Sequence, residues 1–154
     1  MNQLNCALVY VRKLFVAIWI GKIVFFASSI APTVFKVLAR NDAAALQAQI
    51  FPKYFGLGLV STGVVLIISL ILMLQNRSAL KPKIVVALSA IALGLYANLL
   101  FNITPDILRL QPEVLLLPKG STAAVALEFA QIHSLSTSLN LATLILGLVI
   151  LALV

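Results

Sequence analysis

Long apolar runs dominate the pattern of hydrophobic and polar positions along the chain. They cover residues 14–35, 55–74, 84–104 and 131–153. Each run is about 20 residues long, which lets a helix cross the roughly 30 Å hydrocarbon core of a bilayer. The runs are continuously apolar rather than alternating, so they predict helices and not the strands of a membrane barrel. The sequence therefore predicts an all-α protein: one membrane domain over residues 1–154, built as a four-helix transmembrane bundle with a long last helix.

The connections between the runs carry signals for helix ends and surface segments. Residues 75–83 predict a short basic turn, and Pro82 and Pro105 predict the two ends of the third span. Before the second span, residues 42–46 predict a capped helix that extends over the membrane surface. In the longest connection, residues 114–117 predict another short interfacial segment. We expect both of these segments on the non-cytoplasmic side.

The composition places this bundle in lipid. Of the 154 residues, 62% are hydrophobic and 10% are charged, whereas a soluble domain carries roughly 25% charged residues. One small core cannot hide so much apolar surface, so the lipid bilayer is the expected partner. The length leaves no room for a separate soluble domain beside four spans.

Charge sets the expected orientation and excludes one kind of partner. The formal charge is +7, but the basic residues are scattered at span ends without interleaved aromatics, so nucleic acid is not an expected partner. Each predicted side of the membrane carries five basic residues, so the counts alone tie. The side that holds both termini and the short turn has no acidic residue, and its basic residues are concentrated near the span ends. We therefore predict a bacterial inner-membrane protein with both termini inside. The basic residues of that side are Arg12, Lys13, Arg77, Lys81 and Lys83.

The first apolar run could also be interpreted as a secretory signal peptide. It follows two basic residues, and residues 29–31 imitate a small-residue cleavage site. However, the run is longer than a usual signal core, contains Lys22, and would place Pro32 directly after the cut. We therefore expect a retained span. The single cysteine, Cys6, allows no internal disulfide.

Polar residues inside the predicted spans are the candidates for function, because an intramembrane polar group is costly without a partner or a task. His133, Ser136 and Asn140 recur at steps of three and four, so they share one face of the fourth span. Asn98 and Asn102 share a face of the third span in the same way. Counting about 1.5 Å per residue from the span ends brings these five residues to one depth.

This predicted polar layer lies near the non-cytoplasmic end, with Tyr54 and Asp106 expected beside it. One interpretation is that its members only join helices, at roughly 0.6–2 kcal/mol for each hydrogen bond. The other is that they bind a ligand. His133 can titrate, ligate a metal or haem, or relay protons. As the only histidine of the chain it cannot build a two-histidine site. It is the one candidate metal ligand of the layer. We expect no cofactor.

Lys22 lies apart from the layer, about 12 Å from the cytoplasmic end of the first span. The residues expected at its depth, Ser69, Ser89 and Thr143, include no carboxylate. Since an unpaired buried ammonium is expensive, two alternatives remain open. Either the side chain snorkels to the headgroups, or it lies inside the bundle and holds an anionic ligand or lines a water-filled cavity.

Three short motifs, in the same order along the chain, resemble elements of a known family. Residues 50–55 resemble an F-P-x-Y-F element, and residues 133–141 resemble an H-x-x-S-x-x-x-N-L element. The first span carries a similar tryptophan–glycine pattern. Together these motifs are similar to the transmembrane protein 205-like family, a four-span domain of unknown function. The other matching positions are Trp19, Gly21, Phe26, Pro32, Phe51 and Pro52.

The resemblance implies four spans and a shared site at the motif residues, but no established reaction. Similar small bundles include copper-resistance membrane domains and a haem-binding protoporphyrinogen oxidase, whose first spans also carry a tryptophan–glycine element. This chain lacks the several histidines that those sites would use. The resemblance therefore argues for the architecture more than for any metal or haem chemistry.

Three functions remain open at this point. The favoured one is a small transport or ligand-binding bundle with a polar intramembrane layer. The first alternative is a structural or interaction subunit without a ligand, and the second is a redox protein that uses His133 as an axial ligand. No phosphate-binding loop, nucleophile elbow or paired intramembrane acid occurs, so we do not expect an enzyme. The sequence leaves the formation of homo-oligomers open.

Overall fold

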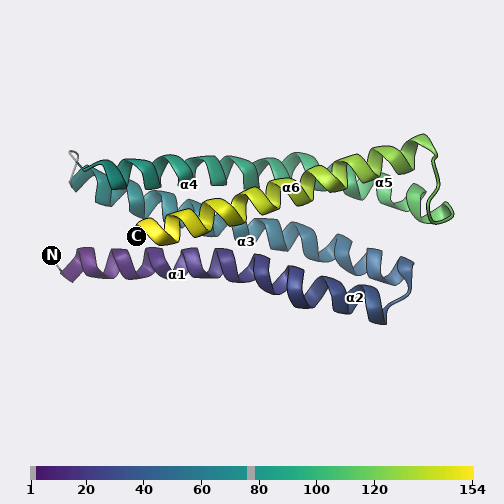
Figure 1. The fold of residues 1–154 in the computed structure, drawn as a ribbon, viewed down its shortest axis with the longest axis horizontal. Helices are drawn as coiled ribbons and strands as arrows, with labels where there is room; N and C mark the ends of the chain where they lie inside the picture. Colours follow the sequence, from purple (N-terminus) through teal and green to yellow (C-terminus); the bar gives the residue numbers. More distant parts are fainter. Residues whose placement is uncertain (1–2, 76–78) are drawn as a thin grey trace.

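A computed structural model describes residues 3–75 and 79–154 of the chain, and it is helical throughout its regular structure (Figure 1). Four helical units in these parts are long and apolar enough to cross a membrane. The prediction of an all-α bundle with four spans is therefore confirmed. Residues 76–78 of the predicted basic turn, including Arg77, lie outside the described residues.

The four units are longer than the predicted spans, and two of them are built from three segments each. The first contains α1 (Gln3–Phe25), the π-helical turn η1 (Phe26–Ile30) and α2 (Ala31–Val37). The second is α3 (Arg40–Gln75). The third contains α4 (Leu80–Asn98), the π-helical turn η2 (Leu99–Ile103) and α5 (Thr104–Leu116), and the fourth is α6 (Ala124–Leu153).

The two π-helical turns explain why prolines do not end the first and third units. Pro32 directly follows η1 in the first turn of α2, and Pro105 follows η2 in the first turn of α5. A proline removes one i→i−4 hydrogen bond and crowds the carbonyl four residues earlier, and a wider π turn relieves both constraints. The predicted helix end at Pro105 is therefore wrong, because the helix continues to Leu116.

The two predicted interfacial segments are helical, but each is continuous with a longer unit. Residues 42–46 lie in the first two turns of α3. Pro52 lies inside this helix and does not break it. Val114 and the two residues after it form the last turn of α5. The separate surface helix predicted before the second span is therefore corrected to an extension of that span.

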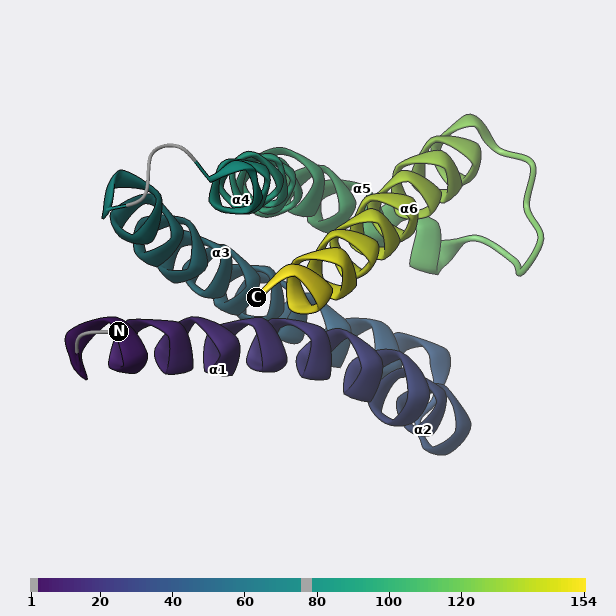
Figure 2. The same cartoon turned by 60° about the vertical axis from the view of Figure 1, so that its left-hand side comes forward.

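The helices are closely packed at one end of the bundle and diverge at the other. α1 and α4 each pack against both α3 and α6, whereas α3 and α6 lie diagonally, without close backbone contact among the described residues. Figures 1 and 2 both show α2 leaning away from α6 at the end opposite the termini. This divergence determines where a cavity can form.

The closely packed end is built around Trp19. Its ring is fully buried and meets the Tyr96 ring edge to face, with 6.1 Å between the ring centroids. Gly147 of α6 faces it, and a Cβ at this position would lie 3.4 Å from the indole. Small residues allow such close helix packing in lipid, where no hydrophobic effect drives helices together. Trp19 therefore has a packing role at the centre of α1, α4 and α6.

Candidate functional site

Lys22 points from α1 into the bundle. Its Nζ donates a hydrogen bond of 3.1 Å to the backbone carbonyl of Tyr54, and lies 3.8 Å from the centroid of the Tyr54 ring. The Tyr96 ring centroid lies 4.4 Å from the same nitrogen. Two aromatic faces and a carbonyl attract a cation and replace part of its lost hydration. The snorkelling alternative is therefore wrong.

A set of hydrogen bonds connects these tyrosines to α6. The Tyr54 hydroxyl and the Asn140 side chain are joined at 3.0 and 3.3 Å, which links the diagonal helices α3 and α6. A bond of 3.1 Å joins the hydroxyl groups of Thr143 and Tyr96, which links α6 to α4. We call Lys22, Tyr54, Tyr96, Asn140 and Thr143 the tyrosine–lysine cluster.

Asn98 and Asn102 do not face the fourth span. Asn102 is exposed, and its Nδ2 donates to Oδ1 of Asn98 at 2.9 Å along their own helix. The buried face of this unit is instead occupied by Tyr96, Leu99 and Ile103. The prediction that the two asparagines complete the polar layer is therefore wrong. The larger side chains set the orientation of the helix, and the two amides satisfy each other on its outer side.

Asp106 also lies outside the layer. Its carboxylate is 3.7 Å from the Arg109 guanidinium, which is itself 3.6 Å from Glu128, and all three side chains are at least half exposed. Exposed pairs of this kind contribute little to stability. Asp106 is thus part of a surface ion-pair group that joins α5 to α6.

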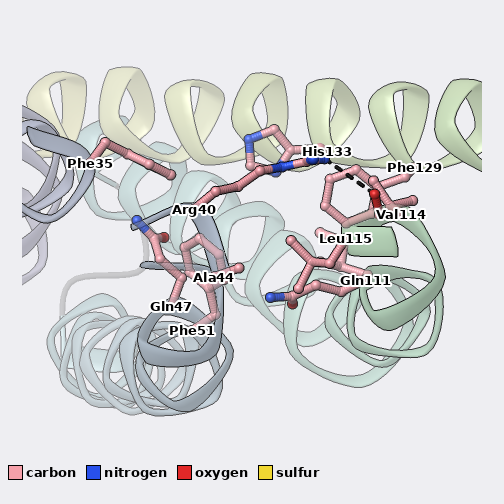
Figure 3. A pocket seen from close by; sticks show the side chains of 11 residues that line it. Phe35, Arg40, Ala44, Gln47, Phe51, Gln111, Val114, Leu115, Phe129 and His133 are labelled. Carbon is pink, nitrogen blue, oxygen red and sulfur yellow. Dashed lines mark hydrogen bonds between the residues drawn. The ribbon is translucent and has the colours of Figure 1, made fainter. Parts of the chain in front are cut away.

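A partly open cavity of about 310 Å³ lies beside the tyrosine–lysine cluster, between the first unit, α3 and α6. A second cavity of about 180 Å³ adjoins it, extends to Arg40 and the end of α5, and is shown in Figure 3. The two share Phe35, Gln47, Phe51 and His133. We call this continuous space the lateral groove, because it opens where α2 and α6 diverge.

Three polar side chains face the lateral groove without a hydrogen-bond partner within the described chain. Gln47 is only 6% exposed and Ser136 only 7%. The ring of His133 stacks on Phe129 with an interplanar angle of 4° and is exposed along the groove. Buried polar groups normally have hydrogen-bond partners, so the inaccessible Gln47 and Ser136 are available to a bound molecule, and the exposed imidazole of His133 lies beside them.

Sequence reasoning missed Gln47, because the residue precedes the predicted second span. Since α3 begins at Arg40, the amide lies on the same helix face as Phe51 and Tyr54 and reaches the groove. The available signal was the spacing of these three residues, at steps of four and three. Treating residues before Pro52 as a separate surface helix hid that signal.

The remaining motif positions differ in their surroundings. Gly21 faces open space on the outer side of α1, and Pro52 is tolerated inside α3. Phe51 forms a wall of the lateral groove. Across the described residues, no three histidine, cysteine, aspartate or glutamate side chains come together to hold a metal. His133 is thus the only residue of the groove with a metal-ligating side chain.

Replacing Asn140 by alanine tests the connection between α3 and α6. We expect it to lower the free energy of unfolding by about 1–2 kcal/mol, since the Tyr54 hydroxyl loses its partner inside the membrane. Thermal unfolding in detergent measures this loss. Asn98→Ala is the matched control. It should lower the free energy of unfolding by less, because the Asn98–Asn102 pair joins no helices. Equal losses for both variants would contradict the conclusion that Asn140 connects α3 to α6.

The fold and the groove together define the class of this molecule: a multi-pass helical membrane protein with a polar cluster beside a partly open intramembrane cavity. The sequence profile of a domain of unknown function, DUF4149, matches residues 14–114. The chain belongs to this family. The match includes Lys22, Gln47, Tyr54 and Tyr96, but ends before α6.

One relative covers a larger share of the chain than the family profile does. An uncharacterized protein of Aquifex aeolicus (strain VF5) is 35% identical over 126 residues, which cover 80% of this chain and 79% of that protein. No solved structure matches the chain. The comparisons therefore establish the family and leave the activity to be argued from the groove.

Proposed function

We propose that this protein binds an amphipathic molecule, which enters the lateral groove sideways from the lipid. The observation that carries the proposal is the partly open cavity of about 310 Å³, where unpaired polar groups face aromatic walls. Ligand sites are typically concave and mostly apolar, with a few placed polar groups. An apolar cavity of about 150 Å³ already holds benzene, so this space accommodates a ring-sized group.

The pairing of polar groups favours binding over a purely structural role. Tyr54 and Asn140 bond to each other, as interhelical packing requires. Gln47 and Ser136 are about as inaccessible, but they face the groove unpaired. Their polar atoms stay open to the groove, whereas the unpaired Oγ atoms of Ser61 and Ser69 are enclosed in the packed interior. Polar groups that are unpaired and open to an apolar cavity are placed to bond to a ligand.

The proposal assigns different roles to the residues predicted from the sequence. Tyr54, His133, Ser136 and Asn140 line the groove and would contact the ligand. Lys22 lies against the Tyr54 ring and would position that ring. Asn98 and Asn102 are outside the proposed site.

We also propose that the protein lies in a bacterial inner membrane with both termini in the cytoplasm. The concentration of basic residues near the span ends, in the short turn and at the start of the first span, supports this orientation. The order of the three motifs supports a finer placement in the transmembrane protein 205-like family. In this arrangement the mouth of the groove, near Arg40, is close to the outer surface of the membrane.

A substitution that fills the cavity tests the proposed function. Ala31 lines the cavity from α2, so Ala31→Phe should occupy the space without disturbing the closely packed end. We expect the purified wild-type protein to retain an extractable amphipathic molecule, and Ala31→Phe to retain at least about fivefold less, a loss of about 1 kcal/mol in binding. Mass spectrometry of organic extracts from washed, detergent-solubilised protein measures the retained amount.

Ala17→Phe provides the control, since Ala17 lies on the exposed face of α1. This variant should retain as much of the molecule as the wild type. Circular dichroism would establish that both variants keep their helical content. If every extracted molecule were equally abundant in folded Ala31→Phe and Ala17→Phe, the groove would not be a binding site.

A further inference from the structure

We propose that the molecule bound in the lateral groove has an uncharged, flat head group with hydrogen-bond acceptor oxygens, and an apolar tail. A quinone ring with an alkyl or isoprenoid chain has this chemistry. This inference rests on the proposed function, because it specifies the ligand class of the same groove. Its evidence is the charge, the hydrogen-bonding capacity and the shape of the lining.

Charge excludes an anionic head in the deep part of the groove. Among the described residues, no lysine or arginine side chain lines this part, and Lys22 is not among its residues. The Lys22 amine is instead held by the Tyr54 carbonyl and two tyrosine rings. An acidic head would therefore enter a low-dielectric space without a free counter-charge, which is costly.

Within the described chain, Arg40 is the only charged residue on the groove, and its side chain extends toward Val114 of α5 (Figure 3). Its guanidinium already donates to the carbonyls of Leu117 and Val114, at 2.9 and 3.2 Å. A fatty acid anchored there would place its alkyl chain against Gln47 and Ser136. Those buried polar groups would then stay unpaired, so we infer that the polar head lies deep and the tail lies toward the lipid.

The deep part offers hydrogen-bond donors from two opposite helices. Gln47 on α3 presents an amide, while Ser136 and His133 on α6 present a hydroxyl and an imidazole. Each of the three groups can donate to an oxygen acceptor. Because α3 and α6 lie diagonally across the cavity, a ring with carbonyl oxygens at opposite positions can bond to both sides at once.

Aromatic walls match a flat ring. The centroid of the Phe26 ring lies 4.8 Å from that of Tyr54 and 5.8 Å from that of Phe51, and all three residues line the cavity. Aromatic groups attract one another in offset and edge-to-face arrangements. A flexible acyl chain gains no such contacts. The walls therefore select a planar head over a second alkyl chain.

Three probes with the same ten-carbon chain test this inference: decyl-para-benzoquinone, decylbenzene and decanoate. Binding to detergent-solubilised full-length protein is measured by equilibrium dialysis, with empty micelles subtracted. We expect the quinone to bind at least about tenfold more tightly than the other two. We expect Gln47→Leu to weaken quinone binding about tenfold, as for the loss of one buried hydrogen bond, and to leave decylbenzene binding unchanged.

Gln49→Leu is the matched control, because Gln49 is exposed on the same helix. It should not change the binding of any probe. Unchanged decylbenzene binding in Gln47→Leu shows that this variant is folded with its groove intact. The inference is overturned if decylbenzene or decanoate binds the wild type as tightly as the quinone, or if Gln47→Leu binds the quinone normally.

The same assay separates failure of this inference from failure of the proposed function. If Ala31→Phe lowers the binding of the probes but the quinone is not preferred, the groove binds ligands of another class. If Ala31→Phe and Ala17→Phe bind all three probes equally, the groove binds none of them, and both proposals fail.

Discussion

Replacing Gly58 by alanine is expected to destabilise the bundle by roughly 1–3 kcal/mol, as overpacking does in a closely packed interior. A Cβ at Gly58 would overlap the ring of Tyr96, with the Tyr96 Cδ1 and Cζ atoms each only 2.6 Å away. Tyr96 has little room to move, because its side chain is fully buried against Trp19 and bonded to Thr143. One methyl group should therefore disturb both the core and the tyrosine–lysine cluster.

Gly56→Ala is the matched control for this prediction. A Cβ at Gly56 meets nothing within 4 Å, so the change should be neutral or stabilise α3 by up to about 1 kcal/mol through helix propensity. Thermal unfolding in detergent, followed by Trp19 fluorescence, measures both variants. Each kcal/mol corresponds to roughly 2–4 °C for a chain of this size. Equal melting temperatures would show that Tyr96 does not lie against Gly58.

The sequence predicts the architecture well because the bilayer imposes a simple rule on the chain. A spanning helix needs about 20 apolar residues, and four such runs are visible without any knowledge of packing. The places where helices end are harder to predict. Pro105 indicates an end by its local chemistry, but η2 accommodates it and the helix continues to Leu116. Such a π turn has no simple sequence signature.

The candidate site is less predictable, because depth along a helix does not determine which face is buried. Asn98 and Asn102 are four residues apart, as a shared site requires, but Tyr96 and Leu99 turn that face outward. The prediction for α6 is better, since Ser136 is buried and Asn140 is bonded to Tyr54. The partners of Lys22 are hard to predict from the sequence, because the residue has no acidic partner in the part of the chain that the structure describes. Its amine lies instead over two aromatic faces, those of Tyr54 and Tyr96.

Removing the Tyr54 ring is expected to lower the free energy of unfolding more when Lys22 is present than when it is absent. The Lys22 amine lies 3.8 Å from the ring centroid, in a partly buried site. A desolvated cation–π contact is worth about 2 kcal/mol. Tyr54→Leu should therefore lower the free energy of unfolding by about 1–2 kcal/mol more in the wild type than in the Lys22→Met background. Denaturation of the four variants in detergent measures this coupling as a double-mutant cycle.

Tyr54→Phe provides the control, because phenylalanine keeps the ring face and loses only the bond to Asn140. Its coupling to Lys22→Met should stay below about 0.5 kcal/mol, since the backbone carbonyl that accepts from Nζ is present in every variant. Lys22→Met alone should change the free energy of unfolding little, because the lost contacts of the ammonium are offset by the desolvation cost that methionine does not carry. Equal coupling for Leu and Phe would show that the ring does not hold the amine. Strong coupling for Leu alone would mean that this lysine is stabilised inside the membrane by aromatic faces instead of an acid.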